Sequence, residues 1–197
     1  ISEKLALLNH DRFQTMDLTA KDQNPAVALF AGDTYVGLDA ASMDDADLTY
    51  AQDHLRILSG LFGLLRPLDK IQPYRLEMGT RFENPRGGNL YQFWGGKIAA
   101  QLNASDQSEN PVVVNLASQE YFKAIDRKTL RAQIITPNFK EWRNGKLKII
   151  SFSAKRARGM MARFIIRNRI KNPDEIKAFN VSGYSYSPEH SEGDNWV

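Results

Sequence analysis

The sequence predicts a mixed α/β fold, built as one compact domain over residues 1–197. A chain of this length is long enough to bury a sizeable core. Its apolar residues occur partly in short β-branched runs and partly at helical spacing, which is typical of a mixed fold. No apolar run approaches the roughly eighteen residues of a membrane span, and the first residues lack a secretory pattern. We therefore expect a cytoplasmic protein without membrane contact.

The expected helices are recognised by spacing and by their end signals. Residues 1–13 are amphipathic with helical spacing. A second helix is expected to begin near Ser42 or Asp44, either of which can cap it, and to stop at Gly60. Residues 90–103 are expected to form one helix, although two glycines inside it cost roughly 2 kcal/mol relative to alanine.

The expected strands are short. Residues 111–118 (PVVVNLAS) form a buried strand by composition, and Ser118 can cap the helix that follows. Between 132 and 152, Asn144-Gly145 separates two strand-like runs, a strong signal for a β-hairpin. Residues 25–38 fit a strand or a short helix followed by a turn, and GYSYS near the end fits a strand.

Charge is strongly segregated along the chain. Residues 111–171 carry fifteen basic and three acidic side chains, a net charge of +12, whereas residues 1–53 have a net charge of −7. A concentration of basic residues is typical of a surface that attracts a polyanion such as DNA. The alternative is that the acidic N-terminal part folds against the basic part and neutralises it.

The most basic helix is expected over residues 153–170. Helical spacing places Ala157, Met161 and Phe164 on one face, toward the core. The cations expected to line the opposite, DNA-binding face are Lys155, Arg156, Arg158, Arg163 and Arg167. Gly159 lies on that face too, where its lack of a side chain lets a phosphate or another backbone come close. A solvated surface and an amphipathic membrane-surface helix are the alternatives.

A second candidate site lies in residues 54–79. Gly60 and Gly63 bracket a tight turn that we expect to join two helices, an arrangement that directs backbone N–H groups at a DNA phosphate. Arg66 and Arg75 add positive charge beside it. A simple packing corner is the alternative, since the glycine spacing departs from the usual pattern.

Four segments, taken together and in order, resemble a known family. They are LSGLFGLLRPLDKIQPYRLEMGT, LYQFWGGKI, VVNLASQEYFKAI and ISFSAKRARGMMARFIIRNRI. They are similar to the YaaA peroxide-stress family of bacterial proteins. The resemblance covers nearly the whole chain, but the family's usual N-terminal strand and its SPAKT-like segment have no counterpart, so we expect that piece to be missing.

The resemblance implies a fold and a function. It implies a basic helix lining a positively charged cleft, a helix–hairpin–helix element matching residues 58–66, and binding of double-stranded or branched DNA. It also implies protection against hydrogen peroxide through limitation of free intracellular iron. No cofactor is expected.

Other function classes find weaker support in the residues. Asp69 and Glu77 are the candidates for an acidic catalytic residue of a base-excision-like enzyme beside the hairpin. His10, His54 and His190 lack ligand spacing, so we expect no metal site, although an iron-binding protein is an alternative. Four aromatic residues that could stack on exposed bases, or lie in the core, are Tyr91, Phe93, Trp94 and Trp142.

Overall fold

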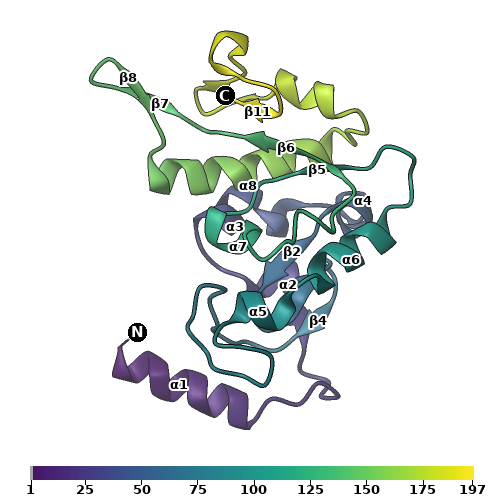
Figure 1. Ribbon diagram of the computed structural model, residues 1–197, viewed down its shortest axis with the longest axis vertical. Coiled ribbons are helices and arrows are strands. Elements are labelled where there is room, and N and C mark those ends of the chain that lie inside the picture. Colours follow the sequence, from purple (N-terminus) through teal and green to yellow (C-terminus); the bar gives the residue numbers. More distant parts are fainter. Residues whose placement is uncertain (1) are drawn as a thin grey trace.

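A computed structural model describes residues 2–197 of the chain and confirms the mixed α/β fold (Figure 1). The α-helices are α1 (Glu3–Gln14), α2 (Ala26–Leu29), α3 (Asp33–Leu38), α4 (Asp45–His54), α5 (Leu90–Trp94), α6 (Lys97–Ser105), α7 (Gln119–Phe122) and α8 (Ser151–Arg167). The strands are β1 (Asn24–Pro25), β2 (Ile57–Ser59), β3 (Gly63–Leu65), β4 (Lys70–Ile71), β5 (Val112–Val114), β6 (Gln133–Pro137), β7 (Glu141–Arg143), β8 (Lys146–Lys148), β9 (Asn180–Val181), β10 (Tyr184–Ser185) and β11 (Asn195–Trp196). Three 3₁₀ segments cover Ala40–Ser42, Pro173–Ala178 and Pro188–His190.

Helix α8 is the central element of the upper part of the molecule. The parallel strands β5, β6 and β11 form a three-stranded sheet in the order β11-β6-β5, and α8 runs along it (Figure 1). Ala157 and Met161 bury their side chains in the core that includes Ile135 of β6. On another side α8 packs against α3. The helix is therefore covered on two sides. Its charged side chains lie on the parts of the helix surface that neither the sheet nor α3 covers.

The expectation of a single apolar face on α8 was therefore wrong. The face bearing Ala157 and Met161 does lie in the core, but Gly159, Ala162 and Ile166 are buried as well. These last three lie on the side that the sequence assigned to solvent and DNA. Helical spacing in one segment does not reveal a second packing partner, since that partner comes from residues far away in the chain.

Residues 57–65 form a β-hairpin, which corrects the expected helix–hairpin–helix element. Strands β2 and β3 pair antiparallel, with Ile57 opposite Leu65 and Ser59 opposite Gly63. The Ser59 hydroxyl accepts a hydrogen bond of 2.8 Å from the Phe62 N–H and so holds the turn. The preceding helix α4 ends at His54, well before the stop expected at Gly60. Short apolar runs buried on both faces do not distinguish strand from helix by periodicity.

The segment expected as one helix over 90–103 is divided into α5 and α6. Gly95, at φ +49° and ψ −127°, ends α5, and Gly96 starts α6. The left-handed φ of Gly95 is open to glycine and strained for other residues. The pair that was expected to be tolerated inside a helix is therefore the break between two helices.

Several local expectations are confirmed. The helix at the N-terminus spans Glu3–Gln14. Asp44, one of the two expected caps, accepts a hydrogen bond from the Asp47 N–H at the start of α4, and Ser118 caps α7 in the same way. In the 25–38 segment the short helices α2 and α3 follow the two-residue strand β1.

Candidate nucleic-acid interface

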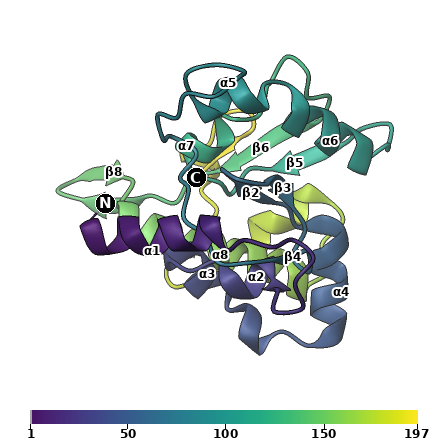
Figure 2. The same cartoon turned by 90° about the horizontal axis from the view of Figure 1, so that it is seen from below.

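The hairpin of β7 and β8 forms where Asn144-Gly145 predicted it. Both turn residues have positive φ values, 53° and 72°, as a two-residue turn of this kind requires. Glu141 lies opposite Lys148 and Trp142 opposite Leu147. The hairpin projects from the body of the protein just beyond the N-terminal end of α8 (Figures 1 and 2). It presents exposed side chains, including Trp142 at 63% exposure.

A set of cations without a carboxylate partner occupies this hairpin and the first turns of α8. In residues 2–197, none of these six forms an ion pair, and we call them the basic edge. The basic edge consists of Lys140, Lys146, Lys148, Lys155, Arg156 and Arg158. All six lie within residues 140–158, where the one carboxylate, Glu141, forms its ion pair with Arg143. Burial of the Arg158 side chain lowers the pKa of its guanidinium, which nevertheless stays charged at neutral pH.

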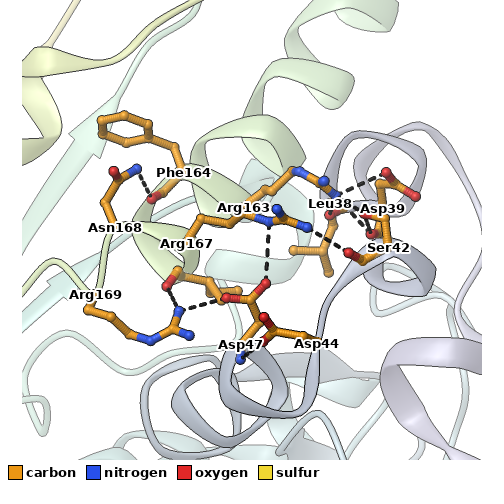
Figure 3. A network of polar contacts seen from close by, with 11 residues as sticks. Leu38, Asp39, Ser42, Asp44, Asp47, Arg163, Phe164, Arg167, Asn168 and Arg169 are labelled. Carbon is orange, nitrogen blue, oxygen red and sulfur yellow. Dashed lines mark hydrogen bonds and ion pairs between the residues drawn. The ribbon is translucent and has the colours of Figure 1, made fainter.

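The C-terminal half of α8 has the opposite arrangement, since its cations are held by acidic residues of the N-terminal part (Figure 3). Arg163 Nη1 lies 3.0 Å from Asp39 Oδ2 and also donates to the Ser42 hydroxyl. Arg167 Nε lies 3.3 Å from Asp47 Oδ2, and it donates to the Ser42 carbonyl. The internal counter-charge that the sequence left open as an alternative is therefore realised in this half of the helix.

Asp47 is the centre of that network. Its side chain is nearly inaccessible to solvent, and Arg169 Nη1 donates to Oδ1 at 2.7 Å. The hydrogen bond from Arg169 lowers the pKa of Asp47, burial works against it, and the charges of Arg167 and Arg169 lower it further. The carboxylate is therefore kept ionised, which suits a buried acid between two cations.

Gly159 serves helix packing in this structure. A Cβ atom at this position would overlap the Thr34 carbonyl oxygen and lie 2.6 Å from Leu38 N. Gly37 of α3 faces α8 in the same way, since its Cβ would overlap the Arg156 carbonyl oxygen. Of the two roles that the sequence left open, the close approach of another backbone is the one observed. Gly159 is buried and offers no surface to a phosphate, which corrects its assignment as a DNA-binding residue.

A shallow groove of about 440 Å³ lies along α3 and α8. Arg156, Arg163 and Arg167, spaced along one side of α8, contribute to its wall, together with Asp39. Arg156 belongs to the basic edge, so the groove continues from it. Of these three arginines only Arg156 is without an ion pair in residues 2–197, because Asp39 holds Arg163 and Asp47 holds Arg167. Their internal pairing corrects the assignment of Arg163 and Arg167 as DNA-binding residues.

The glycine-turn site is not assembled as expected. Gly60 and Gly63 are both buried: a Cβ on Gly60 would overlap the Leu76 carbonyl oxygen, and one on Gly63 would lie 2.7 Å from the Trp94 ring. Neither glycine presents its backbone to an external phosphate, and their assignment to DNA binding is corrected accordingly.

The basic and acidic candidates around that turn are paired with each other. Arg66 Nε lies 3.5 Å from Asp69 Oδ1, and the other oxygen of Asp69 accepts a hydrogen bond from the Arg66 N–H. Arg75 Nη2 lies 2.7 Å from Glu77 Oε1. Both arginines are exposed. Within residues 2–197, no hydrogen bond or ion pair connects them to the cations of α8, so the structure does not bring the two candidate sites together.

Several of the aromatic and histidine candidates pack or hydrogen-bond within the protein. Trp94 lies against the core and donates its indole N–H to the Gly60 carbonyl at 3.0 Å, and Tyr91 donates to the Glu120 carbonyl. His54 stacks on Tyr50 with ring centroids 3.9 Å apart. Over the part of the chain that the structure describes, no group of three His, Asp or Glu side chains is placed to hold a metal ion. No helix in that same part is long and apolar enough to span a bilayer.

Sequence reasoning did not single out the three hairpin lysines as site residues. Lys140, Lys146 and Lys148 were counted only within the +12 segment. The signal that could have identified them was available, because an Asn-Gly turn joining such short strands predicts an exposed hairpin. Lys146 and Lys148 of β8 are exposed accordingly, and Lys140, just before β7, is partly exposed.

Comparison with known proteins identifies the family. The family model described as "Peroxide stress protein YaaA" matches residues 1–190. A UPF0246 protein of Saccharophagus degradans is 55% identical over 200 residues, covering 100% of this chain and 78% of the relative. A UPF0246 protein of Teredinibacter turnerae is 54% identical with the same coverage, and one of Ralstonia nicotianae is 52% identical. The chain therefore belongs to the peroxide stress protein YaaA family, and this membership supports a role in the peroxide stress response.

Proposed function

We propose that the protein acts in the peroxide stress response by binding DNA through its phosphates, without reading sequence. The observation that carries this proposal is a division of the basic segment. The cations of the C-terminal half of α8 are paired internally, whereas the six cations of the basic edge have no carboxylate partner in the described chain. Unpaired cations at this density repel one another, and a polyanion relieves that repulsion. Phosphates are spaced along DNA at distances that several lysines and arginines can contact at once.

The partner in this proposal is double-stranded or branched DNA. The resemblance to the YaaA family implies this partner, and the projecting hairpin presents cations that a DNA backbone could contact (Figure 1). Contacts of this kind position a protein on DNA but carry no base specificity.

The test is a salt titration of affinity. Fluorescence anisotropy of a labelled duplex and a four-way junction should show log affinity falling linearly with log salt concentration. Lys155→Ala and Arg156→Ala should each weaken binding severalfold for every sequence and reduce the slope by about one. No binding at low salt would overturn the proposal.

Lys70→Ala is the matched control. Lys70 is also exposed and without an ion pair in residues 2–197, but β4 lies at the opposite end of the molecule from the hairpin (Figure 1). It removes the same charge from the protein and should leave the slope unchanged. Equal effects of Lys70→Ala and Lys155→Ala would mean that only net charge matters and that the basic edge is not a site.

The limitation of free iron that the resemblance implies stays a prediction. It is tested by measuring chelatable iron in peroxide-treated cells that carry the wild type or the Lys155→Ala/Arg156→Ala double variant. If DNA binding is required, the double variant should not lower iron. Gel analysis of the recovered oligonucleotide tests the enzymatic alternative with Asp69 or Glu77, since an intact strand contradicts it.

A further inference from the structure

A pocket lined by aromatic side chains opens at the foot of the β7–β8 hairpin. Its volume is about 300 Å³, at the lower end of the range of about 300–1,000 Å³ typical of small-molecule sites. Its aromatic lining consists of Phe139, Trp142, Phe179, Tyr184, Tyr186, His190 and Trp196. These side chains come from β7 and the residues just before it and from the chain after residue 178, so folding gathers them from distant positions.

The aromatic rings meet edge to face. Trp142 and His190 have ring centroids 5.8 Å apart at 82°, and the Phe139 and Tyr184 rings are 5.5 Å apart at 87°. In an edge-to-face pair the edge of one ring covers one face of the other, so a free ring face requires an exposed side chain. Trp142 is such a side chain, whereas Phe139 is buried. A flat aromatic ligand could stack on a face that such an arrangement leaves available.

The charges at the pocket favour one class of ligand. Lys140 and Lys177 are both part of its lining. Lys177 Nζ lies 4.4 Å from the centre of the Trp196 ring and 2.6 Å from Asp174 Oδ1. Asp174 therefore holds Lys177, and Glu189, which also lines the pocket, lies 3.4 Å from His190 Nδ1. Lys140 is the lining lysine without an ion pair in residues 2–197, and it suits a neutral ring that is linked to a phosphate.

The pocket is continuous with the basic edge. Lys140 belongs to both, and Trp142 lies in β7 of the same hairpin that carries Lys146 and Lys148. A nucleic-acid backbone held on the basic edge would thus have the pocket within reach of its bases. Base stacking on aromatic side chains is the usual way in which proteins hold unpaired nucleotides.

We propose that this pocket receives one unpaired nucleobase, supplied by the DNA that the basic edge binds. The inference rests on the proposed function for the source of the base, but the pocket itself is defined by its own side chains. Unpaired bases occur at branch points, bulges and damaged positions, where leaving the stack costs least. The pocket would therefore direct a phosphate-binding protein to irregular DNA.

The first experiment uses adenosine, which has a base and no phosphate. Titration of the full chain with adenosine should quench tryptophan fluorescence saturably, because Trp142 and Trp196 line the pocket. Trp142→Ala and His190→Ala should each weaken this binding about tenfold, with Trp196 still reporting in both variants. Phe152→Ala is the matched control, since Phe152 is an equally exposed aromatic residue near the hairpin but does not line the pocket. Quenching that does not saturate, or that both pocket variants leave unchanged, overturns the inference.

The second experiment connects the pocket to DNA. Two duplexes are compared by anisotropy, one with a single bulged adenosine and one with an abasic bulge at the same position. The wild type and Phe152→Ala should bind the adenosine bulge about tenfold more tightly, and Trp142→Ala should bind both equally. Equal affinities of the wild type for both bulges overturn the inference while the proposed phosphate binding stands. Saturable adenosine binding without any DNA binding would instead refute the proposed function and leave a nucleoside site.

Discussion

At the scale of single residues, Gly159 and Gly37 decide how closely α3 and α8 approach. Each glycine faces the backbone of the other helix, and a methyl group at either position would overlap a carbonyl oxygen. Backbone atoms, unlike the ends of flexible side chains, cannot move aside independently. Asp39, directly after α3, and the Leu38 carbonyl reach Arg163 because the helices are this close.

Gly159→Ala should therefore destabilise the protein despite improving helix propensity by about 1 kcal/mol. Overpacking of a close contact costs typically about 1–3 kcal/mol and here involves backbone, so we expect a net loss of about 1–2 kcal/mol. Thermal unfolding followed by circular dichroism should show a melting temperature lower by roughly 2–8 °C.

Gly88→Ala is the control for the glycine change itself. The nearest atom to a Cβ at that position is Gln92 Oε1 at 3.9 Å, so the substitution should change stability by less than about 0.5 kcal/mol. A Gly159→Ala protein as stable as Gly88→Ala would contradict the packing role.

At the scale of elements, the break between α5 and α6 depends on the conformation of one glycine. Gly95→Ala should cost about 1–3 kcal/mol, because its backbone angles lie in a region that a Cβ makes unfavourable. Gly96→Ala is the matched neighbour: Gly96 is helical, and its Cβ would meet Thr129 at an ordinary 3.5 Å. Denaturant unfolding should show a lower midpoint for Gly95→Ala alone. Equal midpoints for both variants would mean that the chain can continue as one helix.

The β7–β8 hairpin, which the proposed function uses, is an element with little part in the core. Trp142 and Ile149 are more than half exposed there, and the two-residue turn fixes the register that places Arg143 opposite Lys146. Lys146 and Lys148 are exposed and form no ion pair in residues 2–197, so we expect them to contribute little to folding stability. Their substitution should consequently affect binding to DNA and leave the unfolding temperature nearly unchanged.

At the scale of the whole molecule, Asp47 joins the acidic N-terminal part to the basic segment, residues 111–171. The pKa of Asp47 is lowered in the folded state, chiefly by the hydrogen bond from Arg169. The unfolded chain therefore binds a proton more readily at this position than the folded chain. Its contribution to stability is present above the unfolded pKa of about 4 and is lost as pH falls through the lower, folded pKa.

Asp47→Asn should test this linkage. The variant should melt several degrees below the wild type at pH 7, because Arg167 and Arg169 lose their shared anion, and the two melting curves should converge toward pH 2. Asp53→Asn is the control, since Asp53 is an exposed α4 carboxylate without an ion pair in residues 2–197. A difference between Asp47→Asn and the wild type that is the same at pH 2 and pH 7 would contradict the role of the charge.

Local structure was largely determined by the sequence itself. The Asn144-Gly145 turn, the caps at Asp44 and Ser118, and the helix over 151–167 follow from interactions between residues close in the chain. The segregation of charge and the four motifs that identify the family are likewise properties of the sequence alone.

Tertiary structure alone decided which candidate residues remain available for binding. Arg163 and Arg156 have the same periodic position on α8, yet only Arg163 meets a carboxylate, from a residue 124 positions away. The short apolar runs on either side of Gly60 and Gly63 fit a strand or a buried helix equally well, and only the fold shows that they pair as β2 and β3. Helix propensity and charge act locally, whereas ion pairing and burial depend on partners that only the fold brings into contact.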